Sequence, residues 1–221
     1  MSAPRLRDRI LRRAHHAGVD PTPQQLAGLE AYFSELARWN RRLNLTALPL
    51  EGEGIDQAID RLIVEPVLAS RLIPTSTRRL MDVGSGGGSP AIPIKLSRRD
   101  LDLTMVEVKV RKCAFLRQVI RRFELDETHV ENSRFEALLA RPEMHESFDV
   151  VTVRAVRLEP SVWTGLQAFL RPGGQIINLA ARPEIADIPP PLVVRGAHAL
   201  PLPVRTYAVV VEKRNLPFSF T

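Results

Sequence analysis

Apolar side chains recur at helical spacing in the first third of the chain, where residues three or four positions apart form one stripe: Leu26, Leu29, Phe33 and Leu36. This spacing predicts an amphipathic helix. Its start is predicted at residues 22–25, Thr-Pro-Gln-Gln, because threonine can cap a helix, proline fits the first helical position and glutamine can complete a capping box. Segments 5–17 and 55–72 predict further helices. Residues 1–74 therefore predict a small helical cap.

From residue 75 onward, short apolar runs alternate with helical patterns. The runs that predict strands lie near 80–83, 101–107, 128–131, 148–153, 175–180 and 206–212. Helices are predicted near 90–98, after Glu107, and near 134–141 and 160–170. Such alternation is typical of a parallel sheet with helices on both faces. Segment 183–205 is rich in proline and predicts a connection that returns the last strand antiparallel to the others.

The turn after the first predicted strand is unusually rich in glycine. Residues 80–94 read Leu-Met-Asp-Val-Gly-Ser-Gly-Gly-Gly-Ser-Pro-Ala-Ile-Pro-Ile, with four glycines within five positions. Glycine permits positive φ angles and lets a ligand approach the backbone, while the helix that follows offers unpaired N–H groups and a positive dipole end. The turn therefore predicts a site for a ligand with an anionic group.

The register of the glycines separates two classes of cofactor. A dinucleotide fingerprint, G-x-G-x-x-G, would place Ser89 where its third glycine belongs, whereas Gly84, Gly86 and Gly88 fit the alternative G-x-G-x-G. Asp82 precedes the turn, and its carboxylate would repel a pyrophosphate but attract the ammonium and sulfonium of S-adenosylmethionine. S-adenosylmethionine is favoured, while a dinucleotide, or no ligand at all, stays open.

A second acidic residue supports an adenosine site. Glu107 ends the second predicted strand about twenty residues beyond the glycines, where an acid accepts hydrogen bonds from ribose hydroxyls. Both cofactor classes share this feature. Glu107 therefore strengthens the prediction of a nucleoside ligand without choosing the cofactor.

Composition narrows the setting in which the protein acts. The net charge of +6 and the pI near 10.2 favour a polyanionic partner such as nucleic acid. Cys113 is the one cysteine, which rules out an intrachain disulfide and a cysteine-based metal site. No apolar run approaches the roughly 20 residues of a spanning helix, and the arginine-rich segment 5–13 lacks the apolar core of a secretory signal. We expect a cytoplasmic, monomeric protein without a metal.

Several separated motifs together resemble one family, the bacterial 16S ribosomal RNA guanine-N7 methyltransferases, also called glucose-inhibited division protein B. They occur in the same order over residues near 25 to 180 and read Arg38-Trp39-Asn40, Asn44-Leu45-Thr46, the loop from Gly84 to Pro93, the helix from Lys109 to Leu116, and Arg154-Ala155-Val156. A lone glycine loop could not produce this agreement.

The resemblance implies a class I S-adenosylmethionine-dependent methyltransferase, with a Rossmann-like, mostly parallel seven-stranded sheet, one antiparallel strand and a helical N-terminal extension. It implies one guanine of 16S ribosomal RNA, in the small ribosomal subunit, as acceptor. The implied catalytic residues are Arg154 and Asn44. The cofactor contacts that the resemblance implies are Gly84, Ser89, Phe135, Glu136 and Arg154. The glycine turn adds Ser85, Gly86 and Gly88, and the charge and ribose arguments above add Asp82 and Glu107.

The chain departs from the family pattern on the presumed acceptor side. The family's histidine followed by Asp-Ser corresponds to residues 61–65, Arg-Leu-Ile-Val-Glu. Its Lys-Gly is replaced by Ala180-Ala181, with Arg182 the nearest cation, and its Arg-His by Thr206-Tyr207. A diverged relative that binds the same donor but acts on another substrate, or serves as a non-catalytic ribosomal RNA assembly factor, is therefore the alternative function.

Two interpretations stay open for each of two side chains and for one group of basic residues. Arg154 can orient the guanine or serve as a structural ion-pair partner, since arginines at strand ends often do so. Trp39 can be a core residue or a platform on which a base stacks. The basic helix positions can form a solvated face or a track for phosphates: Arg117, Arg121 and Arg122.

Overall fold

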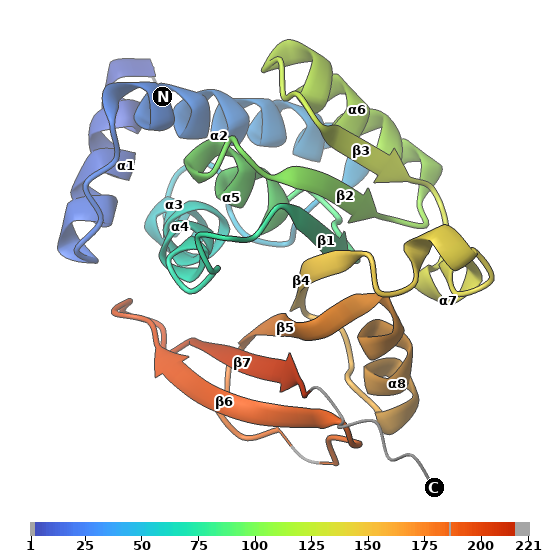
Figure 1. Ribbon diagram of the computed structural model, residues 1–221. Coiled ribbons are helices and arrows are strands. Elements are labelled where there is room, and N and C mark those ends of the chain that lie inside the picture. Colours follow the sequence, from blue (N-terminus) through green and yellow to red (C-terminus); the bar gives the residue numbers. More distant parts are fainter. Residues whose placement is uncertain (1–2, 186, 215–221) are drawn as a thin grey trace, which may run out of the picture.

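A seven-stranded sheet forms the centre of the molecule in the computed structural model, which describes residues 3–185 and 187–214 (Figure 1). The strands are β1 Arg79–Val83, β2 Asp102–Val106, β3 Thr128–Glu131, β4 Phe148–Arg154, β5 Leu170–Ala180, β6 Leu192–Ala199 and β7 Tyr207–Lys213. Their order is β3-β2-β1-β4-β5-β7-β6. Strands β1 to β5 pair in parallel, and β7 runs antiparallel to both β5 and β6. The predicted class and the single antiparallel strand are confirmed.

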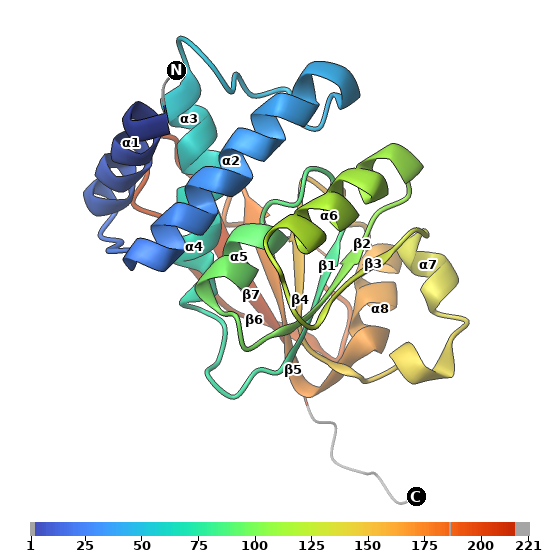
Figure 2. The ribbon, with the colours of Figure 1, turned by 90° about the horizontal axis from the view of Figure 1, so that it is seen from above.

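Helices cover both faces of the sheet, as Figures 1 and 2 show. On one face lie α5 and α6 together with the cap helices α1 to α4, and on the other lie α7 and α8. The helices are α1 Ala3–His16, α2 Pro23–Leu43, α3 Ile55–Ile59, α4 Glu65–Ser70, α5 Ala91–Ser97, α6 Val110–Arg122, α7 Phe135–Leu138 and α8 Pro160–Phe169. None of the helices in the described residues is long and apolar enough to cross a membrane.

The cap and the sheet share one hydrophobic core. Successive strand residues face opposite sides, so Leu80 packs into the cluster beneath the cap while Met81 packs against α8. The first of these clusters extends from Leu6 in α1 to Ala208 in β7. The expected division near residue 74 falls between α4 and β1, and as a domain boundary it stays a prediction.

Helix α2 forms where its periodicity predicts it. The Thr22 hydroxyl accepts a hydrogen bond from the Gln25 amide at 3.2 Å, and the Gln25 side chain accepts one from the Thr22 amide at 3.0 Å. The helix ends at Asn44, which adopts a left-handed conformation with φ of 47°. The capping box and the buried stripe of this helix are therefore confirmed.

The helix predicted over 55–72 is interrupted by a π-helical turn, Asp60–Val64, between α3 and α4. Pro66 has no N–H, so the carbonyl of Leu62 loses its ordinary helical partner. The amide of Glu65 bonds to the carbonyl of Asp60 instead of that of Arg61. The turn thus frees two consecutive carbonyl groups, those of Arg61 and Leu62, for partners outside the helix.

Other boundaries differ from the sequence prediction. Strand β6 lies inside segment 183–205, which was expected to be a connection. It is an edge strand with mostly exposed side chains, so it lacks the alternation that marks a half-buried strand. The helix expected over 134–141 is only the single turn α7, followed by a 3-10 turn, Pro142–Met144. Strand β5 begins at Leu170 rather than near residue 175.

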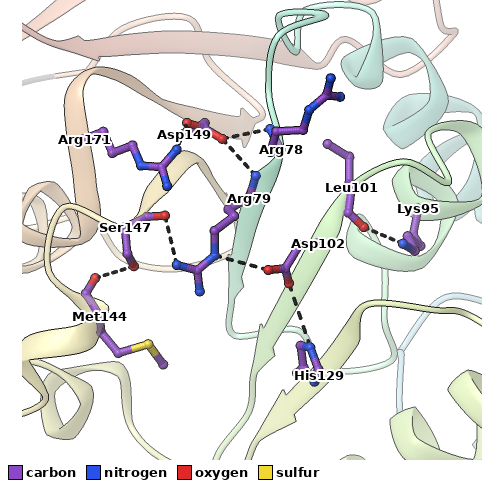
Figure 3. A network of polar contacts seen from close by, with 10 residues as sticks. All are labelled: Arg78, Arg79, Lys95, Leu101, Asp102, His129, Met144, Ser147, Asp149 and Arg171. Atoms are coloured by element: carbon purple, nitrogen blue, oxygen red, sulfur yellow. Dashed lines mark hydrogen bonds and ion pairs between the residues drawn. The ribbon is translucent and has the colours of Figure 1, made fainter.

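The strands begin at an edge tied together by charged groups, shown in Figure 3. The Asp149 carboxylate accepts hydrogen bonds from the amides of Arg78 and Arg79, at 2.8 and 2.9 Å. The Arg79 guanidinium contacts Asp102 at 3.2 Å and lies over the Phe148 ring, 4.7 Å from its centroid. These contacts join β1, β2 and β4 at this amino edge, opposite the glycine turn, so they stabilise the sheet away from the predicted site.

Candidate methyl-donor site

The glycine turn leaves β1 and is held against the end of β2. Gly84, Gly86 and Gly88 have φ angles of 78°, 54° and 88°, which side chains other than glycine rarely adopt. The amides of Gly84 and Ser85 both donate to the carbonyl of Val106, at 2.9 and 3.0 Å. The turn is therefore built at the carboxyl edge of the sheet, where ligands bind in open α/β folds.

The glycines of the turn serve two different purposes. At Gly86 a Cβ atom would meet only the Gly84 carbonyl at 3.7 Å and the Lys112 ammonium at 3.8 Å, so this part faces open space. At Gly88 it would lie 2.8 Å from a side-chain carbon of Ile92 and 3.1 Å from one of Leu116. The first half of the turn is thus accessible to a ligand, while Gly88 allows close packing against α5 and α6.

Asp82 is buried at the end of β1 with one carboxylate oxygen unpaired. Its Oδ1 accepts a hydrogen bond from the Thr152 hydroxyl at 2.7 Å, whereas its Oδ2 has no hydrogen-bond partner among the described residues. Burial raises the pKa of this carboxyl above its ordinary range despite that hydrogen bond. A buried oxygen left unpaired is costly, so the site is incomplete until a donor or a cation reaches it. A cationic ligand group meets that need.

Glu107 is held by backbone amides on both oxygens. The amides of Gly86 and Lys109 donate to its carboxylate at 2.9 and 2.8 Å. The Asn132 side chain donates to the carbonyls of Glu107 and Val108, both at 3.0 Å, and so joins the ends of β2 and β3. Each carboxylate oxygen keeps a lone pair, which suits the hydroxyls of a ribose.

Ser89 and Arg154 connect the glycine turn to the cap. The Ser89 hydroxyl donates to the freed carbonyl of Leu62 at 2.8 Å. The Arg154 guanidinium donates to the carbonyls of Arg61 and Ser89, both at 2.6 Å, and only 14% of its side chain is exposed. Burial lowers the pKa of Arg154, and the nearby Glu65 opposes that shift. This placement favours the structural interpretation of Arg154, and its role in catalysis stays a prediction.

The remaining predicted residues lie around this centre rather than in it. The Phe135 ring packs against α8, where a Cβ on Gly165 would lie 2.8 Å from it, while Glu136 is exposed on α7. Asn44 is exposed at the end of α2, next to Leu45, which packs on Gly87 of the turn. Thus Asp82, the first half of the turn and Glu107 meet at one place, and Asn44 borders it from the cap.

Comparison with known proteins identifies the family. The model of the family GidB, rRNA small subunit methyltransferase G, matches residues 25–188. The chain belongs to this family. The Ribosomal RNA small subunit methyltransferase G of Roseiflexus castenholzii is 30% identical over 96% of this chain and 94% of its own length. That of Xanthomonas axonopodis pv. citri is 34% identical over 85% of this chain and 86% of its own length. The predicted family is confirmed.

Solved structures of low sequence identity share the fold. A SAM dependent methyltransferase from Aquifex aeolicus matches with a TM-score of 0.52 at 12% identity, over 69% of this chain and 91% of its own. Coclaurine N-methyltransferase, bound to N-methylheliamine and SAH, matches with a TM-score of 0.54 at 14% identity, over 90% of this chain and 74% of its own. The fold is that of S-adenosylmethionine-dependent methyltransferases, as predicted.

The positions that depart from the family pattern gather beside Arg154. Arg61 pairs with the fully buried Glu65 at 2.5 Å, and Thr206 is buried next to this pair. Burial raises the pKa of Glu65, an effect that its two neighbouring arginines oppose. Ala180 faces Tyr207 across β5 and β7, while Ala181 and Arg182 are exposed. Three altered segments that are far apart in the sequence thus adjoin one another, at residues 61–65, at Ala180 and at residues 206–207.

Sequence reasoning missed three residues of the site. Thr152 pairs with Asp82, Asn132 positions the Glu107 backbone, and the Tyr32 hydroxyl donates to the Gly87 carbonyl at 2.7 Å. Tyr32 falls between Leu29 and Phe33, the kind of position that periodicity assigns to the core. Of these three residues, only Asn132 offered a signal, because it is a polar residue directly after a predicted strand, at the carboxyl edge.

Proposed function

We propose that the protein transfers the methyl group of S-adenosylmethionine to N7 of a guanine in the 16S ribosomal RNA of the small subunit. Membership of the rRNA small subunit methyltransferase G family, with a match that includes the whole donor site, carries this proposal. A ribosomal RNA substrate agrees with the net charge of +6 and implies action in the cytoplasm. We expect the active form to be a monomer.

The donor site has a chemical group for each part of S-adenosylmethionine. The unpaired Oδ2 of Asp82 suits the ammonium, and the lone pairs of Glu107 suit the ribose hydroxyls. Gly84 and Gly86 let the backbone approach the ligand, and Phe135 and Glu136 follow β3, from where their backbone can reach the adenine. The bound donor supplies an electrophilic methyl group on its sulfonium.

The acceptor chemistry requires positioning rather than a general base. Guanine N7 carries a free lone pair and no proton, so the enzyme has only to hold that nitrogen in line with the methyl group. Arg154 would contribute by holding the cap against the turn through Arg61 and Ser89. Asn44 borders the turn and is our second candidate for orienting the base.

The decisive experiment maps N7-methylguanosine in 16S ribosomal RNA from a host that lacks the gene. We expect one modified guanine to be lost, to return when the wild-type gene is restored, and to stay absent with Asp82→Asn. Purified protein should also transfer labelled methyl groups to small subunits from the deletion host. An unchanged methylation pattern removes the proposal and leaves the diverged donor-binding relative, which the altered group around Glu65 favours.

A further inference from the structure

The surface of α2 that faces away from the sheet carries an organised group of arginines. Glu35, only 3% exposed, pairs with Arg38 and accepts a hydrogen bond from the Trp39 indole at 2.8 Å. A guanidinium nitrogen of Arg122, from α6, lies 3.6 Å from the same carboxylate. The buried Glu35 carboxylate therefore contacts N–H groups of Arg38 and Trp39 from α2 and of Arg122 from α6.

The two arginines of this group remain open to solvent although one end of each is held. Their side chains are 60% exposed for Arg38 and 52% exposed for Arg122. An exposed arginine normally loses much side-chain entropy when it binds a ligand, and a guanidinium that is already oriented loses less. Arginine also binds phosphate oxygens through two parallel hydrogen bonds. The group is thus prepared for an oxyanion.

A hollow of about 410 Å³ lies beside Arg38 and is lined by Arg38, Trp39, Arg41, Arg42 and Leu43. Its volume is within the range of small-ligand sites. The Trp39 ring is held by Phe115, with the ring centroids 5.7 Å apart, so its orientation is set. Aromatic rings and guanidinium planes are the groups on which unpaired RNA bases stack. The lining of the hollow therefore suits a nucleotide.

The same helix also contacts the donor site. Leu36 packs against Gly87, where a Cβ would lie 3.0 Å from a Leu36 methyl carbon, and Tyr32 bonds the Gly87 carbonyl. Helix α2 thus has one side on the glycine turn and carries Arg38 and Arg42 on the other side. The two sides are one helix width apart, about 10 Å, so an RNA strand on the arginines lies near the glycine turn.

We propose that the α2 arginine surface, defined by Arg38, Trp39, Arg41, Arg42 and Arg122, binds the backbone of the substrate RNA at a nucleotide near the target guanine. A phosphate lies on the oriented guanidinium groups, and an unpaired base occupies the hollow beside Trp39. The inference rests on the proposed function, because it takes the partner to be the RNA that is methylated. It adds a docking surface outside the donor site and explains why a buried glutamate stands among arginines.

Binding of fluorescently labelled 16S ribosomal RNA fragments, titrated over a range of salt concentrations, tests the proposal. The double variant Arg38→Ala/Arg42→Ala should bind roughly tenfold more weakly, and the slope of log affinity against log salt should fall by about 0.7 to 0.9 for each lost phosphate contact. Arg99→Ala removes an exposed arginine near the amino edge and should bind like the wild type. Donor affinity, measured by calorimetry with S-adenosylhomocysteine, should be equal in all of them.

The variant Glu35→Gln tests whether RNA binding depends on the orientation of the arginines or only on their positive charge. It removes a negative charge, so charge alone predicts tighter RNA binding, whereas loss of orientation predicts weaker binding. Tighter binding by Glu35→Gln, or wild-type affinity and salt slope in the double variant, would overturn the inference. Failure of the wild type to methylate small subunits would instead overturn the proposed function, so the two failures are distinguishable.

Discussion

The two edges of the sheet differ in how deeply they bury carboxylates and in how completely those carboxylates are paired. At the amino edge, Asp149 is satisfied by two backbone amides and by Arg171 at 2.9 Å. At the carboxyl edge, Asp82 Oδ2 and Glu65 Oε1 are buried with no hydrogen-bond partner among the described residues. Unpaired buried atoms also occur elsewhere, among them the Trp163 indole nitrogen and, at the amino edge, one oxygen of Asp102. The Asp102 side chain is 30% exposed, however, whereas Asp82 and Glu65 are at most 1% exposed, so nearly complete burial distinguishes these two carboxylates. An unpaired oxygen on a fully buried carboxylate calls for a partner, which favours a ligand site at the carboxyl edge.

The largest expected effect on stability tests whether the two halves of the glycine turn differ, with Gly88 packed against helices and Gly86 open to a ligand. Gly88→Ala forces a side chain into positive φ and against Ile92, and should lower the free energy of unfolding by about 3 kcal/mol. Gly86→Ala meets open space and should cost only about 1 kcal/mol while weakening donor binding. Denaturant unfolding and calorimetry measure both quantities. Equal losses of stability would show that the turn is uniform.

Asp82→Asn should separate function from stability at the carboxyl edge. The change keeps the shape of the side chain but removes the charge that suits a cationic ligand, so S-adenosylhomocysteine should bind about 2 kcal/mol more weakly, roughly 30-fold. The free energy of unfolding should stay the same or rise, because an unpaired buried charge is lost. Thr152→Val, which removes only the hydroxyl partner, is the matched control. Undiminished affinity in Asp82→Asn would remove Asp82 from the donor site.

At the amino edge, loss of a carboxylate should lower stability and leave donor binding unchanged, the reverse of the result expected for Asp82→Asn. Asp149→Ala leaves the amides of Arg78 and Arg79 without their acceptor and should lower the free energy of unfolding by about 2 kcal/mol. Donor affinity and turnover, measured well below the midpoint of unfolding, should equal those of the wild type. Loss of turnover in a folded Asp149→Ala protein would break the division between the edges.

The smallest expected effect is a difference in how the contributions of Asp82 and Asp149 to stability depend on pH. Burial raises the folded-state pKa of Asp82 above 3.8, so its contribution to stability becomes less favourable as pH rises from that value through the raised pKa. Burial also acts to raise the pKa of Asp149, but the amides of Arg79 and Arg78, with Arg171, hold it below 3.8. Asp149 therefore stabilises the fold above that value, and this contribution disappears as pH falls through the lowered pKa.

Unfolding of the wild type, Asp82→Asn and Asp149→Asn between about pH 3 and pH 7 measures this difference. Relative to the wild type, Asp82→Asn should gain stability as pH rises. Asp149→Asn should be less stable at neutral pH, with the difference shrinking in acid. Parallel curves for both variants would show that the two carboxylates are in equivalent environments.

Local patterns were enough to predict most of the fold. The stripe of α2 and the alternation of strands and helices depend on neighbours in the sequence, so periodicity finds them. Strand β6 was not predicted because the side chains of this exposed edge strand do not alternate between apolar and polar. Pro66, which removes one helical hydrogen bond, could have suggested an irregular turn in this helix. It could not have shown which residues outside the helix bond to the freed carbonyl groups. Arg154 bonds to a carbonyl 93 residues away, a relation that spacing alone does not encode.

Site residues were predicted where their sequence neighbours mark them and were missed where folding brings them in from distant segments. Asp82 and Glu107 stand at strand ends beside glycines, so their positions followed from the sequence. Their partners Thr152 and Asn132 come from other strands or loops, and although Asn132 follows a predicted strand, nothing near either residue in the chain shows which acid it contacts. Trp39 combines the two interpretations considered for it, since it packs on Phe115 and also lines the hollow.

The hydrophobic cluster from Leu6 to Ala208 also has a consequence for synthesis of the protein. The cap helices leave the ribosome first, yet the core they need is completed only by strands made later, β7 among the last. Contacts between such distant parts of a chain slow folding, because a long loop must close before they form. We therefore expect the nascent cap to stay incompletely folded until β7 has been synthesised, and the cap and sheet to unfold as one cooperative unit.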